Sequence, residues 1–142
     1  MMTTVTITKK LGAPAESAWA AVRSFGHLDE WFPSMETCTV DGDGVGARRR
    51  LVLAGGLGVI TDHLVALDDA ACRLTYERRE SPFPVSSYTG CVEVFRSFDA
   101  RAVVVWTVDF ESSPEDSGPV ADILRAAIGD GLDGMDAGLA HG

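Results

Sequence analysis

The chain has 142 residues, the usual size of one domain with a single hydrophobic core. Hydrophobic residues make up 46% of it and charged residues 23%, a balance typical of globular rather than disordered proteins. The formal net charge is −9, from 21 acidic and 12 basic residues. Because such a charge repels phosphates, the composition argues against nucleic acid and anionic membranes as partners.

The first residues alternate apolar and polar side chains, so they lack the continuous apolar core of a secretory signal. The longest apolar run, residues 51–60, is too short to span a bilayer. Cys38, Cys72 and Cys91 are odd in number and far apart, which fits neither a disulfide framework nor a Cys-x-x-Cys site. We therefore expect a cytoplasmic protein that does not insert into membranes.

The residue pattern predicts a strand, two short helices, six strands and a long helix, in that order. Alternating β-branched residues from Val5 to Lys9 predict the first strand. Apolar residues at helical spacing after Pro14 predict a helix over 15–22, and a further helical turn is expected over 25–31. Short β-rich segments separated by glycine or aspartate pairs then predict an antiparallel meander. Its strands are expected over 36–40, 47–53, 59–67, 74–79, 87–95 and 102–110.

After Pro114 and Pro119, apolar residues recur every three or four positions from Val120 to Leu139, which predicts one long amphipathic helix. Each of its glycines weakens a helix by about 1 kcal/mol relative to alanine, so this helix needs an apolar surface to lie on. A sheet with one apolar face supplies that surface. The expected fold class is α+β, with a curved antiparallel seven-stranded sheet around the C-terminal helix, in one domain over residues 1–142.

Several segments resemble the motifs of common binding or catalytic sites, but the residues around them do not fit those sites. The segment 42–47 fits Gly-x-Gly-x-x-Ala, but arginines and a strand follow it where a dinucleotide site needs a helix. Asp41 and Asp43 imitate the start of a calcium loop whose later ligand positions are valines. The histidines lack zinc-ligand spacing, and no serine elbow or cysteine nucleophile context is present. We expect no metal, no cofactor and no covalent nucleophile.

A hairpin around Gly55-Gly56 brings two opposite charges onto one face of the sheet. Leu53 is expected to pair with Val59 or with its neighbour Gly58, which places Arg49 opposite Asp62 or close to it. In the register of Leu53 with Gly58, the further pairs are Leu51 with Ile60 and Arg49 with Asp62. Besides the ion pair, this face carries the apolar residues Leu51, Leu53, Ile60, Leu64 and Ala66. Two interpretations remain: an exposed ion pair that contributes little, or a buried pair that lines a cavity and anchors a polar ligand head. Tyr76 and Tyr88, on the next two strands, either join this polar cluster or fill half-buried positions.

Five short motifs follow one another at characteristic spacing. They are Val45-Gly46-x-x-Arg49, Thr61-Asp62-His63-Leu64-x-x-Leu67-Asp68-Asp69, Leu74-Thr75-Tyr76, Pro84-Val85-x-x-Tyr88 and Gly131-Leu132-Asp133-x-Met135. With the predicted order of elements, they resemble the START-like, helix-grip SRPBCC superfamily. The closest resemblance is to the bacterial polyketide cyclase/dehydrase group and the related plant abscisic-acid receptors. It runs from about Val5 to Leu139, nearly the whole chain.

The resemblance implies a deep, largely apolar cavity between the sheet and the C-terminal helix. Residues 54–58 match the gate loop of the receptors and residues 81–86 match their latch loop. The gate here lacks the proline and serine of the plant receptors, which argues against hormone sensing. Asp62 matches a cavity position that is usually glutamate, and Arg49 and Tyr88 match pocket positions. Arg49 is the lone arginine expected in the cavity.

The resemblance implies a hydrophobic small-molecule ligand and three candidate functions. A polyketide cyclase or dehydratase would use Arg49 to polarise a carbonyl or enolate oxygen and Asp62 or Tyr88 to move the proton. A non-catalytic carrier or sensor would hold a lipid or other apolar metabolite, and a protein with a filled cavity would do neither. Leu57 and Phe83 are expected as exposed apolar tips, which fits a monomer or a homodimer. The expected ligand-binding residues are Trp31, Phe32, Leu51, Leu53, Leu57, Ile60, Tyr76, Phe83, Trp106, Ile128 and Leu132.

Overall fold

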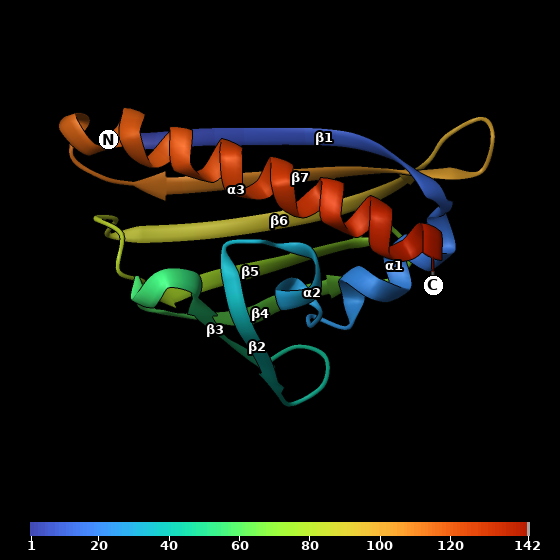
Figure 1. The fold of residues 1–142 in the computed structure, drawn as a ribbon, viewed down its shortest axis with the longest axis horizontal. Helices are drawn as coiled ribbons and strands as arrows, with labels where there is room; N and C mark the ends of the chain where they lie inside the picture. The colour runs from blue at the N-terminus through green and yellow to red at the C-terminus, as the bar shows by residue number, and fades with distance from the viewer. Residues whose placement is uncertain (142) are drawn as a thin grey trace.

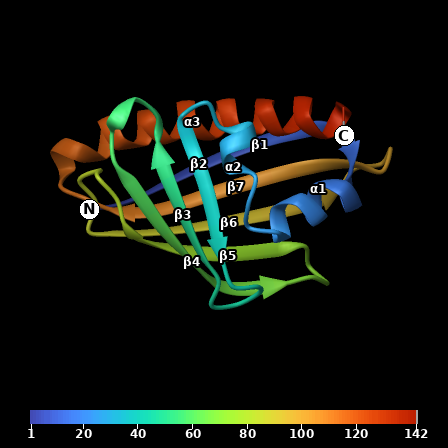
Figure 2. The ribbon, with the colours of Figure 1, turned by 60° about the horizontal axis from the view of Figure 1, so that its bottom comes forward.

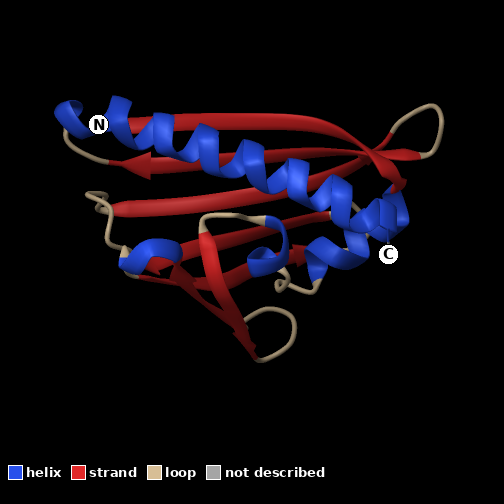
Figure 3. Ribbon diagram, in the orientation of Figure 1, coloured by secondary structure: helices blue, strands red, loops and turns tan. Residues whose placement is uncertain are grey.

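The computed structural model describes residues 1–141, in which a curved antiparallel sheet carries three helices on one side (Figures 1 and 3). The sheet has seven strands in the order β1-β7-β6-β5-β4-β3-β2. Figure 2 shows β2 and β3 running across the direction of β1 and β7, so the sheet curls around α3. The strands are β1 (Met2–Pro14), β2 (Met35–Asp41), β3 (Arg48–Leu53), β4 (Val59–Asp68), β5 (Arg73–Glu80), β6 (Ser87–Arg96) and β7 (Arg101–Glu111). The helices are α1 (Ala15–Arg23), α2 (Leu28–Trp31), α3 (Pro114–His141) and a single 3₁₀ turn, η1 (Ala54–Gly56).

The predicted order of elements and the six-strand meander are confirmed, and most strand ends differ by one residue. The first strand is longer than predicted and reaches Pro14 through a register shift after Lys10. The last helix begins at Pro114, where proline suits the first turn, and the hydroxyl of Ser113 accepts the N–H of Asp116 as a cap. Pro119 lies inside this helix, on its exposed side, where water can satisfy the carbonyl group that proline leaves without a donor.

The alternation along β4 breaks after Leu64. The pairing with β5 shifts between Leu64 and Ala66, which places an extra residue in β4. Ala66 is therefore exposed and Leu67 packs against the core instead. The expected placement of Ala66 on the inner face was wrong, because a strict period of two assumes an unbroken ladder.

Glycines of α3 allow α2 to pack against this helix at very short range. A Cβ atom on Gly134 would lie 2.0 Å from the carbonyl oxygen of Trp31, and one on Gly131 would lie 2.4 Å from the ring of Phe32. These glycines weaken the isolated helix, as the sequence suggested, but they also create the seam between α2 and α3. The seam holds Trp31 and Phe32 against the inside of the molecule, where both are buried.

Candidate functional site

A buried ion cluster of Arg49, Asp62 and Arg78 crosses the inner face of β3, β4 and β5. The strand register pairs Arg49 with Asp62 and Asp62 with Arg78, and the side chains of the three are 3%, 0% and 7% exposed. Nη2 of Arg49 lies 2.8 Å from Oδ2 of Asp62, and Nε of Arg78 lies 2.8 Å from Oδ1. The predicted register of the hairpin is confirmed, and its ion pair is buried rather than exposed. One carboxylate holds two guanidinium groups.

The guanidinium of Arg49 is engaged on every side by the protein itself. Nε and Nη2 donate to Asp62, and Nη1 donates to the carbonyl oxygen of Phe25 at 3.2 Å. The planar group stacks between the rings of Phe25, at 4.0 Å, and Tyr76, at 4.9 Å. Phe25 has a φ angle of 65°, which is rare for a residue with a side chain. Arg49 therefore anchors the strained loop between α1 and α2.

Arg78 lies on the other side of the carboxylate and faces a small hollow beside α3. Its guanidinium stands 4.2 Å from the centre of the Tyr88 ring. Nε and Nη2 donate to Asp62, whereas Nη1 has no acceptor within residues 1–141. The hollow has a volume of about 30 Å³. Its walls are Leu28, Phe32, Met35, Tyr76, Arg78, Tyr88, Trp106, Leu124, Ala127 and Ile128.

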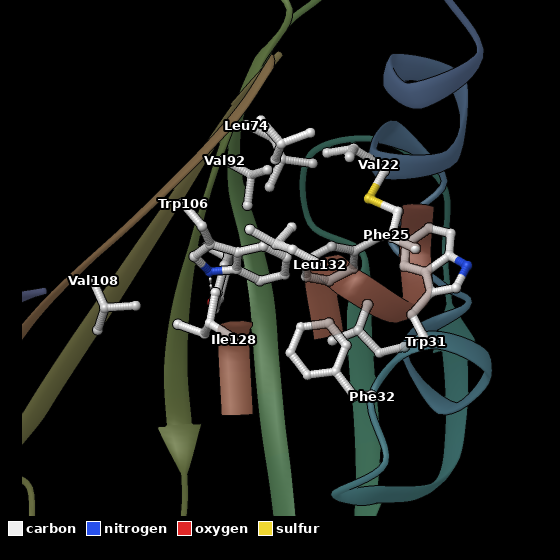
Figure 4. Packing of buried hydrophobic residues seen from close by; sticks show 14 of the residues in the cluster. Val22, Phe25, Trp31, Phe32, Leu74, Val92, Trp106, Val108, Ile128 and Leu132 are labelled. Atoms are coloured by element: carbon white, nitrogen blue, oxygen red, sulfur yellow. Dashed lines mark hydrogen bonds between the residues drawn. The ribbon is translucent and has the colours of Figure 1, made fainter. Parts of the chain in front are cut away.

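Aromatic side chains fill most of the space between the sheet and α3. Figure 4 shows Phe32, Trp106, Ile128 and Leu132 meeting there. Phe32 directly follows α2, Trp106 lies on β7, and Ile128 and Leu132 lie on α3. The rings of Phe32 and Trp106 are 5.5 Å apart, and Trp106 Nε1 donates to the hydroxyl of Tyr76 at 3.1 Å. The structure thus differs from the deep cavity that the resemblance implies, because these rings occupy the space. A ligand larger than a few atoms requires them to move.

The ring of Tyr76 lies directly over a glycine of the neighbouring strand. A Cβ atom on Gly90 would lie 2.1 Å from the Tyr76 Cζ, so only glycine leaves room for the ring in this position. Tyr76 is 1% exposed and carries a hydrogen bond from Trp106 on β7. Gly90 therefore fixes the hydroxyl of Tyr76 at the wall of the hollow.

The acidic and phenolic groups of the site have shifted pKa values. Burial alone would raise the pKa of Asp62, but the adjacent Arg78 and Arg49 outweigh it and lower that pKa below its usual value. Burial is also the main reason that the pKa of the Tyr88 phenol lies well above its usual value. Asp62 is consequently a weak base that stays ionised, and Tyr88 is a neutral hydrogen-bond donor. The site offers donors and positive charge rather than a base that titrates near neutral pH.

The structure brings some of the predicted ligand-binding residues together and separates others. Phe32, Tyr76, Trp106 and Ile128 line the hollow, as does Tyr88 from the predicted catalytic set. Trp31 lines a second, smaller hollow of about 10 Å³ that Arg49 borders. Four other predicted ligand-binding residues are buried in the surrounding core and line neither hollow: Leu51, Leu53, Ile60 and Leu132. Leu57 is 67% exposed and lies outside the interior.

The two loops that match the gate and latch touch each other. A Cβ atom on Gly58 would lie 3.0 Å from Cβ of Pro82, so the loops are in close contact. Gly58 has a φ angle of 135°, which also favours glycine there. Phe83 is half-buried against the core, so its expectation as an exposed apolar tip was wrong, while Leu57 is exposed as expected. In this structure the loops 54–58 and 81–86 are in contact with each other.

Arg78 is the member of this cluster that was not predicted from the sequence, and the expectation of a lone arginine was wrong. Leu74, Tyr76 and Arg78 alternate along β5, so a period of two counted from Tyr76 places Arg78 on the inner face. The signal was present, but the run 77–80 is charged throughout and is typical of a solvated strand end. The position of Asp62 on the neighbouring strand β4 supports the same inward placement of Arg78.

Within residues 1–141, no group of three histidine, cysteine, aspartate or glutamate side chains lies close enough to hold a metal ion. No helix in the same range is long and apolar enough to cross a membrane.

The curved sheet, the long helix that it grips and the polar cluster between them define a helix-grip protein. The chain belongs to the family described as polyketide cyclase / dehydrase and lipid transport, whose model matches residues 2–140. A protein from Thermobifida fusca, solved by NMR in solution, is 33% identical, over 90% of this chain and 83% of its own, with a TM-score of 0.72.

Two further solved structures are similar in fold alone. An uncharacterized protein from Bacillus thuringiensis is 21% identical over 97% of this chain and 99% of its own, with a TM-score of 0.82. Norcoclaurine synthase from Thalictrum flavum is 15% identical over 100% of this chain and 88% of its own, with a TM-score of 0.82. One of its structures holds dopamine and hydroxybenzaldehyde. The same fold therefore carries small-molecule chemistry in a distant relative, which does not transfer to this chain by itself.

Proposed function

We propose that this protein binds an apolar small molecule between the inner face of the sheet and α3. The observation that carries the proposal is the hollow whose walls are mostly apolar and whose polar side is Arg78 with Tyr88. Binding sites for small molecules typically combine such apolar walls with a few placed polar groups. The family description, which includes lipid transport, supports the same function.

Admission of a ligand requires the site to open, because the hollow measures about 30 Å³. The short helix α2 contributes Leu28 to the walls of the hollow and packs closely on α3, so movement of α2 away from α3 would enlarge the site. Phe32 is the α2-linked ring that occupies the space between Trp106 and α3. A bound ligand would replace these ring contacts with its own apolar surface.

Filling the hollow from α3 is expected to block ligand binding. Ala127 is half-buried and lines the hollow, so Ala127→Phe places a ring in the space a ligand needs. With the neutral apolar dye Nile red as the probe, we expect a dissociation constant at least about tenfold higher than in the unmodified protein, or about 1.4 kcal/mol. Fluorescence titration measures this constant.

Ala126→Phe is the matched control, because Ala126 is the preceding residue of α3 and is exposed. It adds the same ring at the surface and should leave Nile red binding unchanged. Thermal melts of both variants report whether each is folded. The proposal fails if the unmodified protein does not bind the dye saturably, or if both variants bind it as the unmodified protein does.

A second candidate function is a cyclase or dehydratase acting on a polyketide-like substrate in the same site. The observation that favours it is the neutral phenol of Tyr88 beside the guanidinium of Arg78, a proton donor next to a positive charge. In this proposal water removes the acidic proton between two ketone groups of the substrate, and the carbanion forms a C–C bond to a second carbonyl carbon. Arg78 stabilises the oxyanion that results, Tyr88 protonates it, and solvent returns the proton to Tyr88. Arg49 and Asp62, the other predicted catalytic residues, then act as positioning residues, since their contacts are to each other, to Arg78 and to Phe25.

Removing the phenol hydroxyl separates this enzyme from a carrier. Tyr88→Phe keeps the ring under Arg78, and we expect the rate of cyclised product formation from a reactive poly-β-ketone to fall at least about tenfold. Nile red binding should stay the same, which controls for the shape of the site. Unchanged rate and product distribution in Tyr88→Phe would leave the carrier function as the better proposal.

A further inference from the structure

The interior of this acidic protein holds one more positive charge than negative charge. The ionised side chains buried on the inner face are Arg49, Asp62 and Arg78, so the cluster carries a net charge of +1. The whole chain, in contrast, has a net charge of −9. Every other ion pair within residues 1–141 includes a side chain that is at least 29% exposed. The surplus charge therefore has no counter-ion inside the described part of the molecule.

A buried guanidinium that shares its carboxylate with a second guanidinium is only partly neutralised, and this is costly because the low-dielectric interior replaces its water shell. The Tyr88 ring under Arg78 offsets part of this cost through its electron-rich face. Asp62 cannot neutralise both arginines, since it brings one charge to two guanidinium groups. A bound anion next to Arg78 would restore the balance of charge.

The polar atoms around the hollow are arranged as hydrogen-bond donors. Nη1 of Arg78 has no acceptor within residues 1–141, and the Tyr88 phenol is neutral at physiological pH, as an ordinary tyrosine is. The Tyr76 hydroxyl accepts a hydrogen bond from Trp106 Nε1 and is also hydrogen-bonded to the Tyr88 hydroxyl, so this pair of phenols keeps one hydrogen to donate to a ligand. The carboxylate of Asp62 already accepts from both arginines. A group that only accepts hydrogen bonds, such as a carboxylate, matches this wall, whereas an ammonium group does not.

We propose that the ligand of this protein is an apolar organic acid whose carboxylate binds at Arg78 and Tyr88 and whose hydrocarbon part lies between the sheet and α3. This inference rests on the proposed small-molecule binding and names the chemical class of the ligand. Arg78 supplies the charge and a free N–H group, and Tyr88 supplies a hydroxyl. Phe32, Trp106 and Ile128 supply the apolar walls.

Paired probes that differ only in their polar end test the charge preference. The first set is decanoate, 1-decanol and decylamine, and the second is 2-naphthoate with 2-naphthalenemethanol. Isothermal titration with the unmodified protein at low salt should give dissociation constants at least about tenfold lower for each acid than for its alcohol, or 1.4 kcal/mol. Decylamine should bind most weakly of the first set. Equal affinity for acids and alcohols would overturn the inference.

Variants of two neighbouring arginines on β5 assign the preference to a residue. Arg78→Gln should bring the affinity for decanoate down to that for 1-decanol, and Arg78→Lys should retain part of the preference. Arg79→Gln is the matched control, since Arg79 is the next residue, is 54% exposed and pairs with Glu77 at the surface. Its preference should equal that of the unmodified protein. An intact preference in a folded Arg78→Gln variant would overturn the assignment.

A spectroscopic measurement on the unmodified protein keeps the inference testable if Arg78→Gln does not fold. The carbon-13 chemical shift of carboxyl-labelled decanoate follows its ionisation, and the pKa of the bound acid should lie below that of the free acid. A raised pKa in the complex would contradict binding at Arg78. If Nile red binds but neither acid binds more tightly than its alcohol, the proposed small-molecule binding stands and the inference that the ligand is an organic acid is rejected. If neither Nile red nor any probe in the two sets binds, both fail.

Discussion

Asp62→Asn is expected to lower the free energy of unfolding by about 3–5 kcal/mol, because it leaves two buried guanidinium groups without their shared carboxylate. Arg49 and Arg78 would then face each other across the amide at short range, and their like charges repel. Urea denaturation followed by the fluorescence of the buried tryptophans measures the loss. The effect should exceed that of any single exposed ion pair in the chain.

Asp41→Asn is the matched control for this variant. Asp41 also pairs with an arginine across neighbouring strands, since Oδ2 lies 2.9 Å from Nη2 of Arg48, but both side chains are more than half exposed. Exposed pairs contribute little to stability, so this variant should unfold close to the unmodified protein. A loss of stability in Asp62→Asn as small as that in Asp41→Asn would show that the buried cluster is not a structural anchor.

The contribution of Asp62 to the free energy of unfolding should also depend on pH and should decrease at acidic pH. Burial raises the pKa of Asp62 and the two arginines lower it by more, so its folded pKa lies below its unfolded pKa. The stability it adds is therefore fully present above the unfolded pKa and is lost as the pH falls through the folded one. The gap between the unmodified protein and Asp62→Asn should be constant above about pH 4 and shrink below it. A gap that shrinks between pH 5 and 7 would contradict the lowered pKa.

The Arg49–Asp62 pair could be predicted from the sequence because the turn limits the register to two neighbouring possibilities, and both place these two residues opposite or close to each other. Gly55 and Gly56 adopt positive φ angles in the turn, and the pairs that follow are set by counting back along each strand. The glycines of α3 and the aromatic segment Trp31-Phe32 were likewise visible as local patterns. What these residues do together was not visible, because the contact of Gly134 with Trp31 joins segments that are far apart in the chain.

The filled interior and the second arginine depend on tertiary packing. The rings of Phe32 and Trp106 could either line a cavity or fill it. The distance between α2 and α3 decides between these two arrangements, and the spacing of apolar residues in the sequence does not reveal that distance. The alternation along β4 breaks at Ala66 because this strand contains one extra residue. No feature of the local sequence indicates where that extra residue is placed. Arg78 belongs to a charged run in which alternation alone suggested an inward side chain. The carboxylate that accepts it, from the adjacent strand, is a property of the fold.

Gly134→Ala is expected to destabilise the protein by about 1–3 kcal/mol, although alanine is the better helix former by about 1 kcal/mol. The added Cβ would lie 2.0 Å from the carbonyl oxygen of Trp31 and 2.8 Å from its carbonyl carbon. Both are backbone atoms, so no side-chain rotation relieves the overlap and α2 has to move away from α3. Because Phe32 follows α2 directly, the same displacement should change the affinity for Nile red.

Gly129→Ala is the control that isolates this contact, since a Cβ on Gly129 meets no atom within 4 Å. It makes the same substitution in the same helix and should stabilise the protein by up to about 1 kcal/mol. The two variants are thus expected to shift the urea midpoint in opposite directions. If both raise it, helix propensity dominates and the seam between α2 and α3 is loose enough to accept a methyl group. If only Gly134→Ala lowers it and also alters dye binding, the α2–α3 seam sets the space available to the ligand.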